Sequence, residues 1–253
     1  LRRRPRLGVA EGNVAGRNPM SPPLRRLAGE FLGTALLLFV IVGSGIAADR
    51  LTDDAGLELV IHAIAVGIGL GAIIAFLAPV SGAHFNPAVT LGFWLTRAMT
   101  PMVAVSYVAA QLLGAIVGVI GANFVFGEVL VAESDIVRTG GRLVASELIV
   151  TFVLVLLVLG MVRSGHGAGV AAAVGAWVVT IILASPSTGF ANPAVTVARG
   201  FTDTYTGIEI GSVPWFVGAQ LLAGIAAAGA ALALYPAGSN GPVESDDTSD
   251  DER

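Results

Sequence analysis

Two asparagines that begin the same five-residue stretch are the strongest chemical signal in this sequence. Asn86 begins one copy of Asn-Pro-Ala-Val-Thr, and Asn192 begins the other. Proline is tolerated at the first position of a helix, and asparagine just before it is a favoured N-cap. Each copy therefore predicts a short helix headed by a carboxamide, where the helix dipole adds a partial positive charge. We expect these amides to be free to donate to a solute.

The two helices that begin at these asparagines are too short to cross a bilayer. The apolar run 86–95 would be roughly 15 Å long as a helix, about half of the ~30 Å hydrocarbon thickness. The run 192–200 is similar. Irregular backbone at membrane depth survives only where protein buries it or where it lines a wet cavity. The alternative is that Asn-Pro starts two ordinary surface helices, which two copies in matching contexts disfavour.

The composition is that of a polytopic membrane protein. Of 253 residues, 55% are hydrophobic and only 13% are charged, whereas a soluble domain has about 25% charged residues. Cysteine is absent, which excludes disulfides and thiolate metal sites. We find no phosphate-binding loop, no metal-ligand spacing and no nucleophile–base grouping. The sequence therefore predicts no enzyme activity, no cofactor, no metal site and no nucleic-acid partner.

Six longer apolar runs surround the two short helices. Each is about the length that a transmembrane helix needs, and they cover residues 27–48, 57–78, 102–124, 143–162, 168–184 and 213–235. Each short helix follows the second run of its half. A polar loop at 127–142 separates the halves, and a tight turn at 163–167 follows the fourth run. The predicted fold class is an all-α membrane protein with six transmembrane helices and two re-entrant half-helices.

The two halves of the chain repeat further polar landmarks. Glu30 and Glu147 lie in the first and fourth runs, and Gln111 and Gln220 lie in the third and sixth. Each half has three full crossings, so the second half must enter from the opposite face. This is an inverted-topology repeat, whose special site lies at the midplane between the halves. We predict one channel domain at 24–236, with half-repeats at 24–126 and 143–236.

The ends of the chain differ from this domain in composition. Residues 1–23 are rich in arginine and proline and lack an apolar core, which predicts a disordered basic arm rather than a signal peptide. Arg25 and Arg26 follow it, and the positive-inside rule then places the N-terminus in the cytoplasm. An even number of spans returns the C-terminus to the same side. Residues 237–253 predict a disordered acidic tail.

Ionisable and polar groups inside the apolar runs are candidates for function. Glu30 and Glu147 have two interpretations: proton-coupling carboxylates of a transporter, or braces that accept N–H groups of the nearby motif loops. Their presence in both halves favours bracing. We expect His84 to fix the first loop and His62 to be a packed neutral histidine. Glutamines in the third and sixth runs are expected to hydrogen-bond between helices.

These features together are similar to those of the aquaporin, or major intrinsic protein, family, over residues 24–236. The resemblance implies six spans, two half-helices, a pore in each subunit and a homotetramer in the lipid bilayer. It also implies passive conduction of water or small neutral solutes, with selectivity set by pore width, lining donors and electrostatic barriers. The motif residues that carry the resemblance are Asn86, Pro87, Ala88, Asn192, Pro193 and Ala194.

One departure from the family pattern concerns selectivity. Most members have arginine directly after the second motif, where this chain has Val195. Spacing from the two asparagines assigns the other constriction positions to Val66, Thr180 and Gly189. Water-selective members usually have an aromatic residue and a histidine at the first two of these. The predicted constriction is therefore small, mostly apolar, uncharged and wider than a water filter.

Arg199 complicates this interpretation because it lies four residues beyond Val195, one helical turn further along the same face. It could line the outer vestibule and partly replace the missing charge. Alternatively, it could be an interface arginine paired with Asp203. In either case, we expect proton exclusion to rest mainly on the paired half-helix N-termini.

The leading functional interpretation is a passive channel in the cell membrane for water and small neutral solutes such as glycerol-like polyols. An alternative substrate is arsenous acid, because the wide constriction resembles that of bacterial members associated with metalloid handling. An alternative of another class is a proton-coupled transporter that uses Glu30 or Glu147. A third class is a structural junction protein with a closed pore.

Overall fold

The computed structural model describes residues 20–236, so the segments 1–19 and 237–253, including most of the predicted arm and the predicted tail, lie outside the described residues. The described part is helical throughout its regular elements, and the elements follow the predicted order. They are α1 (Pro22–Leu51), α2 (Ala55–Ser81), α3 (Pro87–Leu95), α4 (Pro101–Phe126), α5 (Gly141–Arg163), η1 (Gly167–Gly169), α6 (Val170–Ala184), α7 (Pro193–Ala198), η2 (Arg199–Phe201), η3 (Ile210–Ser212) and α8 (Val213–Leu234).

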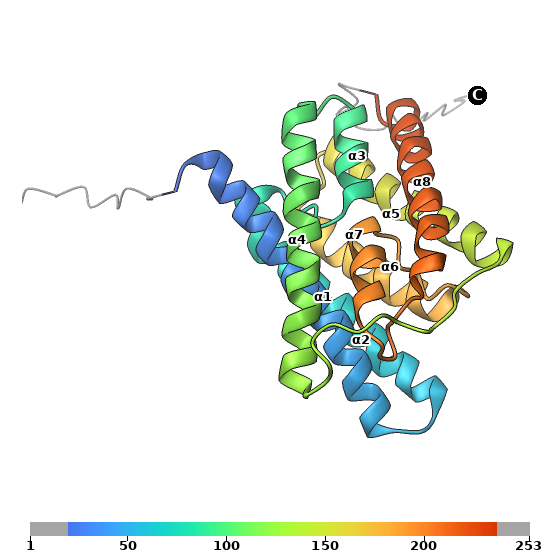
Figure 1. Cartoon of the computed structure of the whole chain (residues 1–253). Helices are drawn as coiled ribbons and strands as arrows, with labels where there is room; N and C mark the ends of the chain where they lie inside the picture. Colours follow the sequence, from blue (N-terminus) through green and yellow to red (C-terminus); the bar gives the residue numbers. More distant parts are fainter. Residues whose placement is uncertain (1–19, 237–253) are drawn as a thin grey trace, which may run out of the picture.

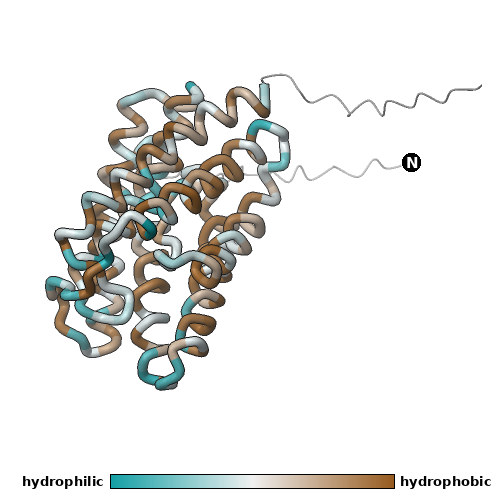
Figure 2. The backbone as a smooth tube through the Cα atoms, turned by 90° about the vertical axis from the view of Figure 1, so that its right-hand side faces the viewer, coloured by the Kyte–Doolittle hydropathy of each residue, from teal (hydrophilic) through white to brown (hydrophobic). Residues whose placement is uncertain are grey.

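Six of these helices are long and apolar enough to cross a membrane. Hydrophobic residues cover them, while hydrophilic residues gather at the connections at the two ends of the bundle (Figure 2). Large apolar side chains such as Ile68, Val105 and Trp215 point outward and are exposed. The predicted fold class, with six spans and two shorter helices, is confirmed in the described residues.

The helices before and after the loop 127–140 pack together in one bundle (Figure 1). In the first half α1 lies along α2 and α4, in the second α5 lies along α8, and α2 meets α6 at the centre. The short helices exchange partners, since α3 packs on α8 and α7 packs on α4. Small residues allow the close approaches, as membrane helix packing requires. A Cβ atom at Gly118 would meet the carbonyl oxygen of Ala35, and one at Gly175 would lie 2.7 Å from that of Gly67.

The connections between the long helices gather at two opposite faces of the bundle. The distal face carries the connections 52–54, 127–140 and 202–212, and the proximal face carries 96–100 and 164–169. The connections before α3 and α7 instead turn back inside the bundle. Because α3 begins there and ends at the proximal face, and α7 begins there and runs toward the distal face, the two short helices point in opposite directions (Figure 1).

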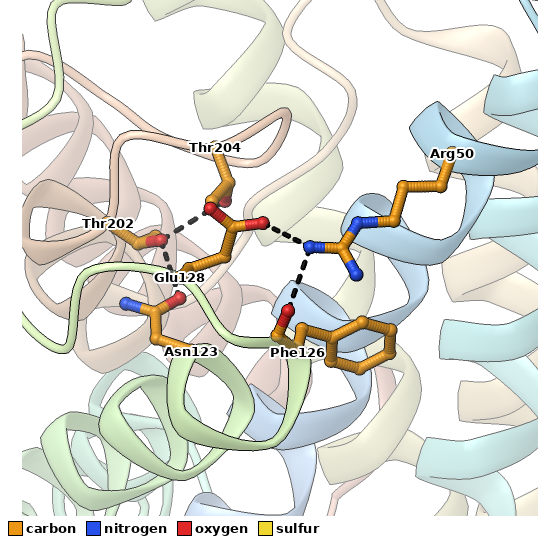
Figure 3. Close-up of polar contacts among 6 residues, drawn as sticks. All are labelled: Arg50, Asn123, Phe126, Glu128, Thr202 and Thr204. Atoms are coloured by element: carbon orange, nitrogen blue, oxygen red, sulfur yellow. Dashed lines mark hydrogen bonds and ion pairs between the residues drawn. The ribbon is translucent and has the colours of Figure 1, made fainter.

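Polar contacts tie the distal connections together (Figure 3). Arg50 donates to the carbonyl oxygen of Phe126 at 2.8 Å and pairs with Glu128 at 2.5 Å. Thr202 Oγ1 donates to Asn123 Oδ1 at 3.0 Å and lies 3.1 Å from Thr204 Oγ1. The loop 127–140 also pairs with the segment after α7, since Glu209 N donates to Ile136 O at 2.8 Å. The segment that follows α7 is therefore held against the end of α4.

Helix ends differ from the predicted runs by a few residues. The second run was expected to end at 78, but α2 continues through Pro79 to Ser81. Proline lies here in the last turn, where its missing N–H removes only one helical hydrogen bond. Gly82 then ends the helix with φ of 92°, a left-handed conformation that glycine adopts readily. The second half-helix ends as a 3₁₀ turn at Arg199–Phe201.

Candidate pore and its constriction

A cavity of about 490 Å³ lies between the two halves of the bundle. At its proximal end it is lined by Val162 and Gly167, and in its middle by Asn86 and Asn192. At its distal end it is lined by His62, Phe190 and Arg199. Most of the wall between these points is aliphatic. The polar side chains of this cavity are those at its centre and distal end, together with His84 and Thr188 of the two motif loops.

Asn86 and Asn192 meet at the centre of this cavity. Each caps its own helix, since Asn86 Oδ1 accepts from Ala88 N at 2.8 Å and Asn192 Oδ1 accepts from Ala194 N at 3.0 Å. Each also donates from Nδ2 across the interface, to Ala191 O and to Phe85 O respectively, both at 2.8 Å. Each amide therefore commits one hydrogen to the opposite motif loop. An amide nitrogen has two hydrogens, so one on each side chain remains for a solute.

Glu30 holds the loop before the first motif. The carboxylate is fully buried and accepts from Ser81 Oγ at 2.7 Å and His84 N at 3.1 Å on Oε1. On Oε2 it accepts from Phe85 N and from Gln111 Nε2, both at 2.8 Å. A carboxylate with donors on both oxygens is well suited to a buried position because its lone pairs are satisfied.

Glu147 repeats this arrangement in the second half. It is also fully buried, and it accepts from Phe190 N at 3.0 Å, Ala191 N at 2.9 Å and Gln220 Nε2 at 2.7 Å. Gln220 in turn lies against Thr196 of the second motif, as Gln111 lies against Thr90 of the first. The repeated acids, glutamines and threonines thus form one network in each half.

These networks hold backbone that is strained without them. Phe85 and Ala191, the residues before the two asparagines, both have φ of 49°. A non-glycine residue in this region costs on the order of 1–3 kcal/mol unless its surroundings fix it. The N–H of each is bound by the glutamate of its half, and the carbonyl of each accepts from the opposite asparagine. The strain therefore falls at the point where the two half-helices meet.

His84 lies beside this network and also reaches the cavity wall. Its Nδ1 is 3.1 Å from Thr90 Oγ1, and its ring stacks on Phe93 with the centroids 4.4 Å apart. Tyr107 packs edge-on against it. These contacts connect the first loop to α3 and α4.

Three of the four predicted constriction residues line the cavity, namely Val66, Gly189 and Val195. Thr180 does not, and its assignment is wrong. It is exposed on the outer side of α6, where its hydroxyl donates to Ala176 O at 2.9 Å. Counting back from Asn192 crosses an irregular loop, and an error of one residue turns a helical side chain by about 100°. The cavity face of α6 instead carries Val174, Val178 and Ile182.

Arg199 is buried, with 4% of its surface exposed, and it lines the distal end of the cavity. Its Nε donates to Thr206 O, and its guanidinium lies over the Phe190 ring, 3.5 Å from the centroid. The alternative pairing with Asp203 is wrong, since Asp203 Oδ1 instead accepts from Asp135 N at 3.2 Å. Within residues 20–236 the only ion pair is Arg50–Glu128, so no carboxylate lies at ion-pair distance from Arg199.

His62 is a cavity residue that the sequence interpretation treated as simple packing. It is buried on α2, lines the distal end of the cavity, and places Nδ1 2.9 Å from Ser44 Oγ. Its spacing could have predicted this position, because His62 lies four residues before Val66 and therefore on the same face of α2. Within the described part of the chain, no group of acidic and histidine side chains is placed to hold a metal ion.

Comparisons with known proteins agree with this geometry. A family model described as major intrinsic protein matches residues 19–191. The chain is 44% identical over 203 residues to aquaglyceroporin AqpS of Rhizobium meliloti, a match that covers 80% of this chain and 87% of that protein. It is 41% identical to the probable aquaporin TIP2-2 of Oryza sativa, over 52% of this chain and 54% of the relative. An X-ray structure of the aquaglyceroporin from Plasmodium falciparum shares the fold, with a TM-score of 0.64 and 24% identity over 82% of this chain and 94% of that one.

Proposed function

Because this chain belongs to the major intrinsic protein family, we propose that the cavity around Asn86 and Asn192 is its conduction path. Family membership makes the chain a multi-pass membrane channel for water and small solutes such as glycerol. The observation that supports this particular path is the meeting of both motif asparagines in the wall of one cavity. The path has polar groups where the halves meet and at its distal end, and mostly aliphatic walls between them, which suits small hydroxylated solutes without a positive charge.

The path can be tested by filling it. Val178 lines the cavity from α6, whereas Leu183 on the same helix is 45% exposed. We expect Val178→Trp to abolish glycerol-driven swelling of proteoliposomes and Leu183→Trp to leave it unchanged. Equal flux through both variants would place the path elsewhere.

Passive conduction is favoured over proton coupling by the contacts of the two glutamates. Glu30 and Glu147 have donors on every carboxylate oxygen. A proton on either carboxylate would displace one of these donors and release a strained loop. Their role in this proposal is to brace the loops, together with His84, and not to carry protons. The protein therefore acts as a channel and not as an enzyme or a coupled transporter.

A second substrate class follows from the wall of the cavity. Val66, Gly189 and Val195 bring no large or charged side chain to the positions that usually form the filter. This favours uncharged hydroxylated solutes larger than water, which include arsenous acid as well as glycerol. Uptake of arsenous acid into the same proteoliposomes, compared with empty vesicles, tests this class directly.

The assembly and orientation belong to the same proposal. The exposed apolar side chains on the outer helix faces support a place in the lipid bilayer of the cell membrane, and membership of the family supports a homotetramer. The arginines up to Arg26, which precede the apolar part of α1, support a cytoplasmic proximal face, with both chain ends on that side. Cross-linking in membranes and protease accessibility of the two ends test these two statements.

A further inference from the structure

The cavity does not end at the positions where the family pattern puts the constriction. Val66 and Val195 line it, yet it continues past them to His62 and Arg199. Within the described residues, none of its lining residues comes from the distal connections 127–140 and 202–212. The polar end of the cavity is therefore formed by side chains that lie beyond the valine pair.

His62 and Arg199 each lie four residues from one of the two valines, on two helices that run in opposite directions. His62 precedes Val66 by four residues on α2, which starts at the distal face. Arg199 follows Val195 by four residues on the half-helix that runs toward the distal face. Four residues are one helical turn, about 6 Å of rise. Both side chains thus lie one turn distal to the valines.

Arg199 presents hydrogen-bond donors to the cavity. Its Nε is used on Thr206 O, and Phe190 supports one face of the guanidinium. Among the described residues, no protein acceptor contacts its Nη groups. These nitrogen atoms are also not fully buried, so they can reach the cavity. Arginine has no acceptor and keeps its charge. It can therefore donate to a solute oxygen and repel a cation.

His62 presents an acceptor. Ser44 Oγ donates to Ile41 O at 3.1 Å, so its oxygen accepts from the Nδ1–H of His62 at 2.9 Å. We assign the tautomer from this network, which leaves the lone pair on Nε2. Tyr205 packs against the ring with the centroids 5.7 Å apart. The backbone carbonyl of the next residue, Thr206, accepts from Arg199. The side chains of His62 and Arg199 are therefore supported by the same segment.

We propose that the selectivity constriction of this channel is displaced one helical turn toward the distal face and is formed by His62 and Arg199, with Phe190 as support. It offers an acceptor and a set of donors to one hydroxyl group, which fits water, polyols and other small neutral hydroxides. The charge of Arg199 excludes cations there. This inference rests on the proposed function, since it requires that the cavity conducts.

Arg138 supplies a matched control. Its guanidinium also lies over the Phe190 ring, 5.2 Å from the centroid, and it donates to Gly207 O at 2.9 Å in the same segment that holds Arg199. It does not line the cavity. A variant of Arg138 therefore disturbs the same ring and segment without touching a solute.

The test compares purified full-length variants in proteoliposomes, with water, glycerol and Na⁺ as probes. Loss of a hydrogen bond to a charged donor should lower glycerol permeability of Arg199→Met about tenfold. The same variant should gain a Na⁺ leak, Arg199→Lys should keep Na⁺ excluded, and Arg138→Met should resemble the wild type. If Arg199→Met does not reconstitute, His62→Leu decides the question by the same loss of glycerol flux.

Two results would overturn the displaced constriction. One is an Arg199→Met variant that matches Arg138→Met in both glycerol flux and Na⁺ leak. The other is a change of solute preference in Val195→Ala, with wild-type preference in Arg199→Met and His62→Leu. Both differ from failure of the proposed function, in which the wild-type protein itself conducts no faster than empty vesicles.

Discussion

Asn86 and Asn192 are joined reciprocally, each donating from Nδ2 to the carbonyl of the residue that precedes the other, at 2.8 Å in both directions. The pair is a cross-link between the two halves of the chain as well as a pair of helix caps. Each bond also fixes a carbonyl that belongs to a residue with positive φ. The geometry of the centre of the cavity thus depends on both asparagines at once.

Replacement of either asparagine should destabilise the protein and open the centre to ions. Asn192→Ala leaves Phe85 O unpaired inside the bundle, which costs about 1–3 kcal/mol, and it removes a helix cap worth about 1 kcal/mol. Asn86→Ala should have an effect of similar size. Thermal unfolding in detergent measures the stability, and proton flux into liposomes measures the leak.

Asn123 is the control for these two variants, because it is equally buried and bonded but belongs to the distal contacts shown in Figure 3. Asn123→Ala should lower the unfolding temperature without a proton leak. A leak of the same size in all three variants would mean that general loosening causes it.

Removal of one acceptor from either buried glutamate should also cost stability. Glu30→Gln or Glu147→Gln turns an amide N–H₂ toward groups that are themselves donors, which we expect to cost about 3 kcal/mol. Glu128→Gln, at a partly exposed ion pair with Arg50, should cost at most about 1 kcal/mol. Chemical or thermal unfolding in detergent compares them. Variants that keep wild-type stability and lose only proton-driven uptake would favour the coupled transporter.

Close helix packing predicts opposite outcomes at two glycines. A side chain at Gly118 would meet Ala35 O and lie 2.8 Å from Leu38 Cβ, whereas a Cβ atom at Gly218 would meet nothing within 4 Å. Gly118→Ala should therefore separate α4 from α1 and reduce the yield of folded protein. Gly218→Ala should be tolerated. Size-exclusion profiles after mild heating measure this, and tolerance of both changes would contradict the packing of α1 on α4.

The corrected face of α6 predicts which side chains affect solute size. Ile182 lines the cavity and Thr180 is exposed. Ile182→Ala should raise the permeability of polyols larger than glycerol because it widens the path, while Thr180→Val should change nothing. Swelling rates with a series of polyols compare the two. The reverse pattern would restore the assignment that spacing alone suggested.

The fold was largely predictable because a bilayer permits few solutions. Apolar runs of sufficient length, two Asn-Pro starts and the repeated Glu30 and Glu147 were enough to predict spans, half-helices and inverted halves. Two of the three predicted constriction residues that lie on helices were placed well, since a fixed number of residues makes a turn. Val66 and Val195 illustrate this, because both line the cavity as expected.

The features that the sequence did not predict correctly depend on irregular backbone or on contacts between distant segments. Thr180 was misassigned because the loop between α6 and Asn192 has no fixed residue count per turn. The hydrogen bond from each asparagine to the opposite loop joins residues more than 100 positions apart, and no local sequence pattern predicts it. The surroundings of Arg199 depend on Thr206, whose carbonyl is positioned by the distal connections.

Glycerol flux through the wild-type protein in liposomes, recorded against glycerol concentration with and without a proton gradient, tests passive conduction most directly. For a passive channel, we expect flux well above that of empty vesicles, linear in concentration, unchanged by the gradient and accompanied by no proton current. Flux that saturates and follows the proton gradient would contradict it.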